Sequence, residues 1–329
     1  MRTHPLLVAL FGVAAIDAAA LPPNAELICP AAAPELSPES YLRALALDLT
    51  GAPPTAEEYA ATSASGTIDE AILDSYLDSD AFAARVVRRH DALLWPNVSN
   101  VTLTAVRNAL SVIGGRYWNR QRATTYRGDA IECLDEPARW DEAGTILTTA
   151  SVNGATNKPV KREGYVLVEP YWMAPGSTIK VCAFDAQPNL YAPSGTACST
   201  KDGQSDPGCG CGPALNWCRG GDADKQIADA IAEDVRRRVR TMIEDNRPYL
   251  DLFTSARAFV NGPLVHYLKN RAAEMANNIR FDPLSIDLAT LPDLGFLDKS
   301  AWTEITLGPE HAGILTSYAY LTRFQTSRS

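Results

Sequence analysis

The sequence has no long uncharged hydrophobic run after its first twenty residues, no block of lysine and arginine that stands out, and no tract dominated by glycine or proline. A membrane-spanning helix needs about 18 or more apolar residues in succession, so no membrane span is expected. The 30 basic and 39 acidic residues give a net charge of −9. Without a concentrated basic face, a nucleic acid is excluded as the main partner. Average glycine and proline content excludes collagen-like and low-complexity chains.

Catalytic motifs are also missing. The chain contains no P-loop, G-x-G-x-x-G, G-x-S-x-G or H-E-x-x-H sequence. Beyond the first twenty residues the histidines are His90, His266 and His311, and none has a second histidine three or four positions away. We therefore predict no metal site and no cofactor, and we assign no catalytic residue. His90 is followed by Asp91, but neighbouring helix residues point about 100° apart, so a dyad is not expected. Packing or capping roles are expected for His266 and His311.

Three weaker patterns point to other functions. Carboxylates are plentiful, so an exported hydrolase that acts on a polymer such as a polysaccharide through paired acids is the alternative function. The segment 202–206 loosely resembles a calcium loop, but it lacks the glutamate at the twelfth position and is better explained as a turn. The tryptophans could line a sugar-binding surface, but they share no spacing and fit core positions better; they are Trp95, Trp118, Trp140, Trp172, Trp217 and Trp302.

Residues 1–20 have the features of a signal peptide. Arg2 provides the positive end, residues 6–16 form an eleven-residue apolar stretch, and three alanines at 18–20 provide a cleavage site. A lipoprotein signal is not expected, because the residue before Cys29 is not small. These features predict an exported protein, located in the periplasm or outside the cell.

Cysteine usage agrees with export. All the cysteines lie beyond the predicted cleavage site, and we predict disulfides for them; they are Cys29, Cys133, Cys182, Cys198, Cys209, Cys211 and Cys218. Five fall within 182–218, a polar and glycine-rich stretch that can bury little apolar surface. Cys209 and Cys211 are too close to bond each other, so each is expected to have a different partner. A zinc site made of the last four is the alternative, but their spacing lacks two C-x2-C pairs.

Three regions follow a linker at 21–36. Residues 37–115 predict a helical module, with a helix start at 37–39, capping boxes at 55–58 and 67–70, and a last helix through 106–112. Residues 116–221 predict an irregular, cysteine-rich insertion with a hairpin formed by 165–171 and 178–183.

Residues 222–329 predict a second helical module. Its first helix carries an apolar stripe and, outside that stripe, a basic cluster expected to be a solvated face; the cluster is Arg236, Arg237 and Arg240. A final helix is expected at about 311–324. The predicted fold is mainly α, with helical bundle modules and a small antiparallel β, cysteine-rich insertion.

The run YLRALALDLTGAPPTAEE at 41–58 resembles the LxLDLTGLPPTPEE signature of uncharacterised exported modules that occur with planctomycete-type cytochrome c domains. Residues 77–95 look like the end of the same module, and 253–267 and 311–324 are similar to a companion module with a GxLT-x-P-AFL segment. The family has no established reaction, and the chain departs from it by lacking C-x-x-C-H and by carrying the insertion. In the motif itself, Gly51 is expected to take a left-handed cap before Pro53 and Pro54.

The resemblance implies a non-catalytic accessory or interaction subunit of a periplasmic or cell-surface redox assembly. Its expected partner is a protein, either a c-type cytochrome or a companion module at the C-terminal side. The apolar helix near the C-terminus supports a partner too, because burying each of its large side chains is worth roughly 1.5–3 kcal/mol. That helix is expected either to pack on the helix at 227–243 or to contact another chain, which would make this sequence the front part of a longer architecture.

Overall fold

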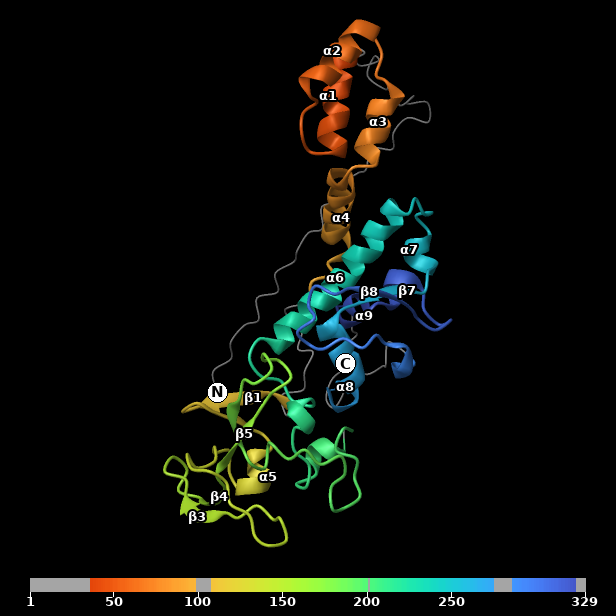
Figure 1. Ribbon diagram of the computed structural model, residues 1–329. Helices are drawn as coiled ribbons and strands as arrows, with labels where there is room; N and C mark the ends of the chain where they lie inside the picture. The colour runs from red at the N-terminus through yellow and green to blue at the C-terminus, as the bar shows by residue number, and fades with distance from the viewer. Residues whose placement is uncertain (1–35, 99–107, 201, 275–285, 324–329) are drawn as a thin grey trace, which may run out of the picture. The chain divides into compact units, whose positions relative to one another are not determined.

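The computed structural model describes residues 36–98, 108–200, 202–274 and 286–323 (Figure 1). They form two compact units, one with residues up to 48 and 52–73, the other with 49–51 and the chain from 74 onward. About 40% of the described residues are helical and 15% lie in strands that make three sheets. The prediction of a mainly α fold is therefore wrong, and the protein is mixed α/β. Each strand has only four residues, too few for an alternating pattern to stand out from the sequence.

The first unit contains helices α1 (Pro38–Leu49), α2 (Ala56–Ser65) and the start of α3 (Glu70–Leu77). The predicted capping box of α2 is present, because Thr55 accepts from the Glu58 amide while Glu58 accepts from the Thr55 amide. The second predicted box is not formed. Asp69 begins α3 instead, with its carboxylate accepting from the Ala71 amide at 3.0 Å. A carboxylate one residue before the helix satisfies its free amides better than the more distant Thr67.

The long helix α6 (Ala223–Glu244) forms the centre of the main hydrophobic core in the second unit (Figure 1). Its predicted apolar stripe is confirmed, since the stripe residues recur every three or four positions and are buried. Helices α4 (Asp80–Leu94) and α8 (Gly262–Glu274) pack against α6. The predicted stripe consists of Ile227, Ile231, Val235, Val239, Met242 and Ile243; the first five are buried, and Ile243 is partly buried against the same core.

Near the end of the described chain, strands β7 (Arg257–Val260) and β8 (Thr303–Thr306) pair antiparallel, after a short helix α7 (Asp251–Thr254). The predicted helix at 311–324 is too long. Residues Gly313–Thr316 form a 3₁₀ turn, and α9 covers only Tyr318–Arg323. Gly313 has φ +52°, which is not helical, and Ser317 is extended (φ −67°, ψ 153°), so the chain leaves the helical conformation at both positions. Helix α9 packs against α6.

The residues from 108 to 221 surround a four-stranded sheet of order β1-β2-β6-β5. The predicted hairpin is confirmed, with β5 and β6 antiparallel and a turn that Gly176 closes at φ +82°. Strand β2 pairs with β1 and, in parallel, with β6. The helix predicted through 106–112 is wrong, because Leu110–Ile113 is a strand. The sheet strands are β1 (Leu110–Ile113), β2 (Arg116–Asn119), β5 (Tyr165–Val168) and β6 (Ile179–Cys182).

A second small hairpin, β3 (Thr149–Val152) with β4 (Pro159–Arg162), and the short helix α5 (Ala123–Arg127) complete this part. Its apolar clusters are small, and each of the three contains cysteine. Three disulfides close them: Cys133–Cys182, Cys198–Cys209 and Cys211–Cys218. Cys209 and Cys211 thus have different partners, and the four cysteines considered as zinc ligands are oxidised. Cys29 lies outside the described residues.

Within the described residues, no helix is both long enough and apolar enough to cross a bilayer. The predicted signal peptide and most of the linker lie outside the described part of the chain. The three disulfides agree with the predicted export into an oxidising compartment.

Candidate functional site

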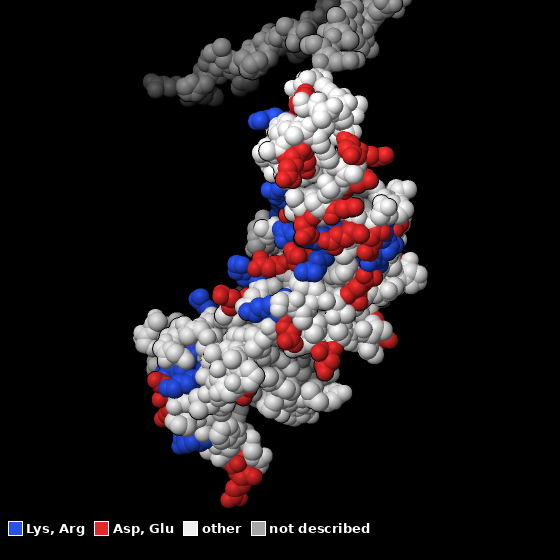
Figure 2. All heavy atoms as spheres, turned by 45° about the horizontal axis from the view of Figure 1, so that its top comes forward, with Lys and Arg blue, Asp and Glu red and all other residues white. Residues whose placement is uncertain are grey.

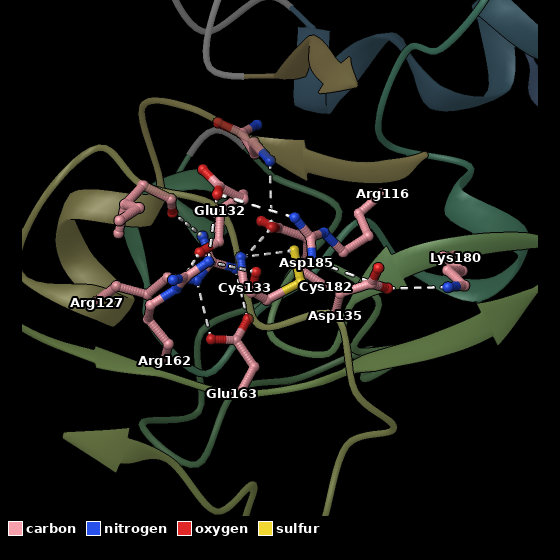
Figure 3. Close-up of a disulfide and its surroundings, with 12 residues drawn as sticks. Arg116, Arg127, Glu132, Cys133, Asp135, Arg162, Glu163, Lys180, Cys182 and Asp185 are labelled. Carbon is pink, nitrogen blue, oxygen red and sulfur yellow. Dashed lines mark hydrogen bonds and ion pairs between the residues drawn. A yellow bond between two sulfur atoms is a disulfide. The ribbon is translucent and has the colours of Figure 1, made fainter. Parts of the chain in front are cut away.

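A buried cluster of charged side chains lies next to the Cys133–Cys182 disulfide (Figure 3). Arg127, at the end of α5, donates through Nε to Glu163 at 2.9 Å and through Nη2 to Asp185 at 3.2 Å. The side chains of all three residues have no solvent exposure. Two carboxylates and one guanidinium are thus enclosed together, which is costly unless their hydrogen bonds are satisfied.

An outer layer of ion pairs flanks the same disulfide (Figure 3). Arg162 on β4 donates to the Cys133 carbonyl at 2.8 Å and contacts Glu132 at 3.2 Å. Lys180 on β6 binds Asp135 at 2.9 Å. These contacts tie the segment around Cys133 to two hairpins, so they hold the backbone of that segment in place.

Burial raises the pKa of Asp185, against the opposing charges of Arg127 and Arg122. Burial likewise raises the pKa of the neighbouring Tyr126, whose hydroxyl donates to the Cys209 carbonyl at 2.5 Å. Perturbed groups in a cleft suggest an active site, but these groups are enclosed. They are best explained as a polar core that replaces apolar packing.

A groove of about 490 Å³ lies beside strand β5 and is here called the β5 groove. One wall is a turn at 139–147 in which Trp140 and Ile146 lie opposite each other. The other walls are β5 and the segments 183–188 and 212–214. Trp140 is 49% exposed and Leu167 is 64% exposed. Among the described residues that line this groove, only Glu169 is charged, so the groove suits an apolar partner surface better than a reaction.

A second groove, of about 380 Å³, contains the features expected of the alternative hydrolase. Asp229 and Glu233 lie one turn apart on α6, near Trp302. Both acids are already neutralised, Asp229 by Lys225 at 2.6 Å and Glu233 by Arg237 at 3.4 Å. The Arg237 guanidinium also lies 4.4 Å from the Trp302 ring centre. The groove therefore offers neither free paired carboxylates nor an open aromatic face.

The histidines are separated, as the sequence indicated. His90 contacts the Val86 carbonyl and the Tyr249 hydroxyl, whereas its neighbour Asp91 binds an arginine of α6. His266 is buried and stacks on Tyr171 with ring centres 3.8 Å apart. Burial, with help from nearby positive charges, lowers the pKa of His266 to about 3. His311 is buried too, with Nδ1 3.2 Å from the Thr316 hydroxyl.

The basic cluster of α6 is partly exposed, as predicted, and it also makes ion pairs that the prediction did not include. Arg236 binds both carboxylate oxygens of Asp91 at 3.0 and 2.9 Å, and Arg240 binds Asp80 at 2.8 Å. These arginines therefore join α6 to α4, an arrangement that the local sequence around 236–240 cannot reveal. Figure 2 shows acidic and basic side chains close together, with no broad basic area on the face in view.

Sequence reasoning missed the buried charge cluster and the β5 groove. Arg127, Glu163 and Asp185 are separated by 22 to 58 positions, and nothing near them distinguishes them from surface residues. A signal did exist for the groove. The tryptophan at 140 lies within a polar, turn-rich stretch that cannot enclose it, so exposure could have been expected there.

Comparisons with protein-family models, with curated proteins and with solved structures find no match to this chain. The choice among functions therefore depends on the geometry described above and on the local resemblance at 41–58.

Proposed function

We propose that this chain is an exported, non-catalytic interaction subunit of a periplasmic or cell-surface redox assembly. The observation that carries the proposal is the β5 groove, an apolar concavity whose walls include exposed tryptophan and leucine side chains. Exposed apolar surface of this kind is retained where a partner covers it.

The state of the ionisable groups supports a non-catalytic role. Three of the buried carboxylates that the structure describes, Glu163, Asp185 and Asp234, each bind an arginine, and the fourth, Asp129, binds Asn153 and Thr156. In the second groove, Asp229 and Glu233 are paired with basic side chains of the same helix. A hydrolase needs one acid and one base whose environments separate their pKa values, and the described grooves provide no such pair.

The redox setting rests on the resemblance of 41–58 to modules that accompany cytochrome c domains. The disulfides agree with an exported location, where such assemblies operate. In this role the helical part would serve as scaffold, and the disulfide-closed part would present the contact surface.

The proposal is tested by tagging the full chain in its native host and cross-linking the cell envelope before capture. Captured material is then stained for covalently bound haem, with an untagged strain as control. We expect a haem-stained partner to be enriched. Absence of such a partner, together with release of sugars from polysaccharides by the purified chain, would favour the hydrolase instead.

A further inference from the structure

The β5 groove has a feature that identifies the conformation of its partner. In the β5–β6 ladder, Gly164 accepts a hydrogen bond from Ala183, and the register places Val166 and Val168 in the same bonding positions. The amide and carbonyl groups of Tyr165 and Leu167 therefore point away from β6, toward the edge of the sheet.

The first half of that edge is already paired. The Tyr165 amide donates to the Glu136 carbonyl, and the Tyr165 carbonyl accepts from the Ala138 amide, both at 2.8 Å. Gly164 permits this approach, because a Cβ there would overlap the Glu136 carbonyl oxygen. Pro137 lies between Glu136 and Ala138 and has no N–H group, so no backbone donor is left unpaired at that position.

The second half of the edge is open. The chain turns away after Ala138, since the Leu147 amide bonds back to the Arg139 carbonyl at 2.9 Å to form the turn that carries Trp140. Among the described residues, none bonds to the amide or carbonyl group of Leu167. An open strand edge beside an apolar groove is the arrangement that binds an extended peptide as an added strand.

Charge indicates which kind of peptide fits. Glu169 lies at the end of β5 and is the charged residue of the groove lining, with its carboxylate accepting from the Gly176 amide at 2.8 Å. The adjoining turn carries two exposed acids, Asp141 and Glu142, and one exposed base, Arg139, so acids outnumber bases around the groove. A basic segment is therefore complementary to this surface.

We propose that the β5 groove binds an extended, basic segment of a partner protein, which adds to the sheet at Leu167 and places alternate apolar side chains against Trp140. This inference rests on the proposed role as an interaction subunit, and it names the surface and the chemistry of the partner. Backbone hydrogen bonds to Leu167 provide affinity, and the groove selects the side chains of the bound strand.

The test uses the full exported chain and an acetylated, amidated eight-residue peptide of alternating valine and lysine. Its binding is measured by calorimetry. Methylating the valine amides of the peptide removes the backbone donors, and we expect Kd to rise by about tenfold. An alternating valine–glutamate peptide should bind more weakly than the lysine peptide. Equal binding of the methylated peptide would overturn strand addition, and equal binding of the glutamate peptide would overturn the choice of a basic partner.

Variants of the protein test the location. Leu167→Pro removes an edge amide that the fold does not use, and Trp140→Ala removes one wall. Each should weaken binding about tenfold, whereas Trp95→Ala, at an exposed tryptophan outside the groove, should not. Circular dichroism checks that the variants remain folded. Unchanged binding by both groove variants, or no binding at all, would overturn the proposal.

Two further outcomes separate this inference from the proposed function. If Leu167→Pro and Trp140→Ala chains still capture the haem-stained partner as well as the parent, the groove assignment is wrong while the function stands. If the lysine peptide binds but no haem protein is captured, the groove assignment stands and the redox role is wrong. Self-association that Leu167→Pro abolishes, measured by sedimentation, would identify a second copy as the occupant and overturn the choice of a separate partner.

Discussion

The helical core around α6 and the disulfide-closed part at 108–221 are stabilised in different ways. Around α6, buried aliphatic and aromatic side chains form one continuous cluster, and a single buried ion pair, Asp234–Arg238, lies on the same helix. In the disulfide-closed part, three small clusters each contain cysteines, and the interior also holds Arg127, Glu163 and Asp185. Apolar burial stabilises the first part without covalent help. The second part buries too little apolar surface, and cross-links that restrict its unfolded chain compensate.

The largest effect should come from reducing the disulfides. The chain-entropy model assigns about 4 kcal/mol to Cys133–Cys182, which spans 49 positions, and about 2–3 kcal/mol to each of the others. We expect hydrogen exchange to show lost protection in β2, β5 and β6 while α6 and α8 stay protected. Loss of protection in α6 at the same reductant concentration would show that the two parts do not differ in this way.

The next effect concerns the buried charges. Replacing Arg127 with methionine leaves Glu163 and Asp185 without their shared cation, at an expected cost of about 3–5 kcal/mol. The measurement is urea unfolding, followed by a spectroscopic signal from the β-rich part. Lys225→Met, which breaks an exposed pair on α6, is the matched control and should leave stability nearly unchanged. A small effect of Arg127→Met would mean that the buried cluster is dispensable.

Acid should weaken the helical core through His266. The folded-state pKa of about 3 lies below the usual value of 6.5, so the folded protein binds fewer protons than the unfolded chain at intermediate pH. The contribution of His266 to the free energy of unfolding is therefore fully present above about pH 6.5. It falls by about 1.4 kcal/mol per pH unit as the pH decreases toward 3. His266→Phe, which keeps an aromatic ring on Tyr171, should remove this part of the pH dependence. Parallel stability curves for parent and variant between pH 6 and 4 would contradict the assignment.

The smallest expected effect is at the surface of the helical core. The Arg236–Asp91 pair joins α6 to α4 and is partly exposed. A double-mutant cycle with alanine at both positions should give a coupling of about 0.5–1 kcal/mol. Added salt should reduce it, since exposed charges are screened. A coupling that high salt leaves unchanged would indicate that the pair is more deeply buried than the structure places it.

The sequence by itself determined the local features of this protein. Periodicity revealed the buried stripe of α6, capping chemistry revealed the start of α2, and Gly51 takes the expected left-handed conformation at φ +80°. The crowding of cysteines indicated that covalent closure replaces a core. Each of these signals arises within a few neighbouring residues, where the physics that selects the conformation is local.

Only the tertiary structure decided the rest. The parallel pairing of β2 with β6, the meeting of Arg127 with Glu163 and Asp185, and the ion pairs that join α6 to α4 all connect distant positions. The open edge at Leu167 exists because a neighbouring segment turns away after Ala138. Strands of four residues have too little pattern of their own, so their partners, and therefore their edges, are set by packing and hydrogen bonding across the chain.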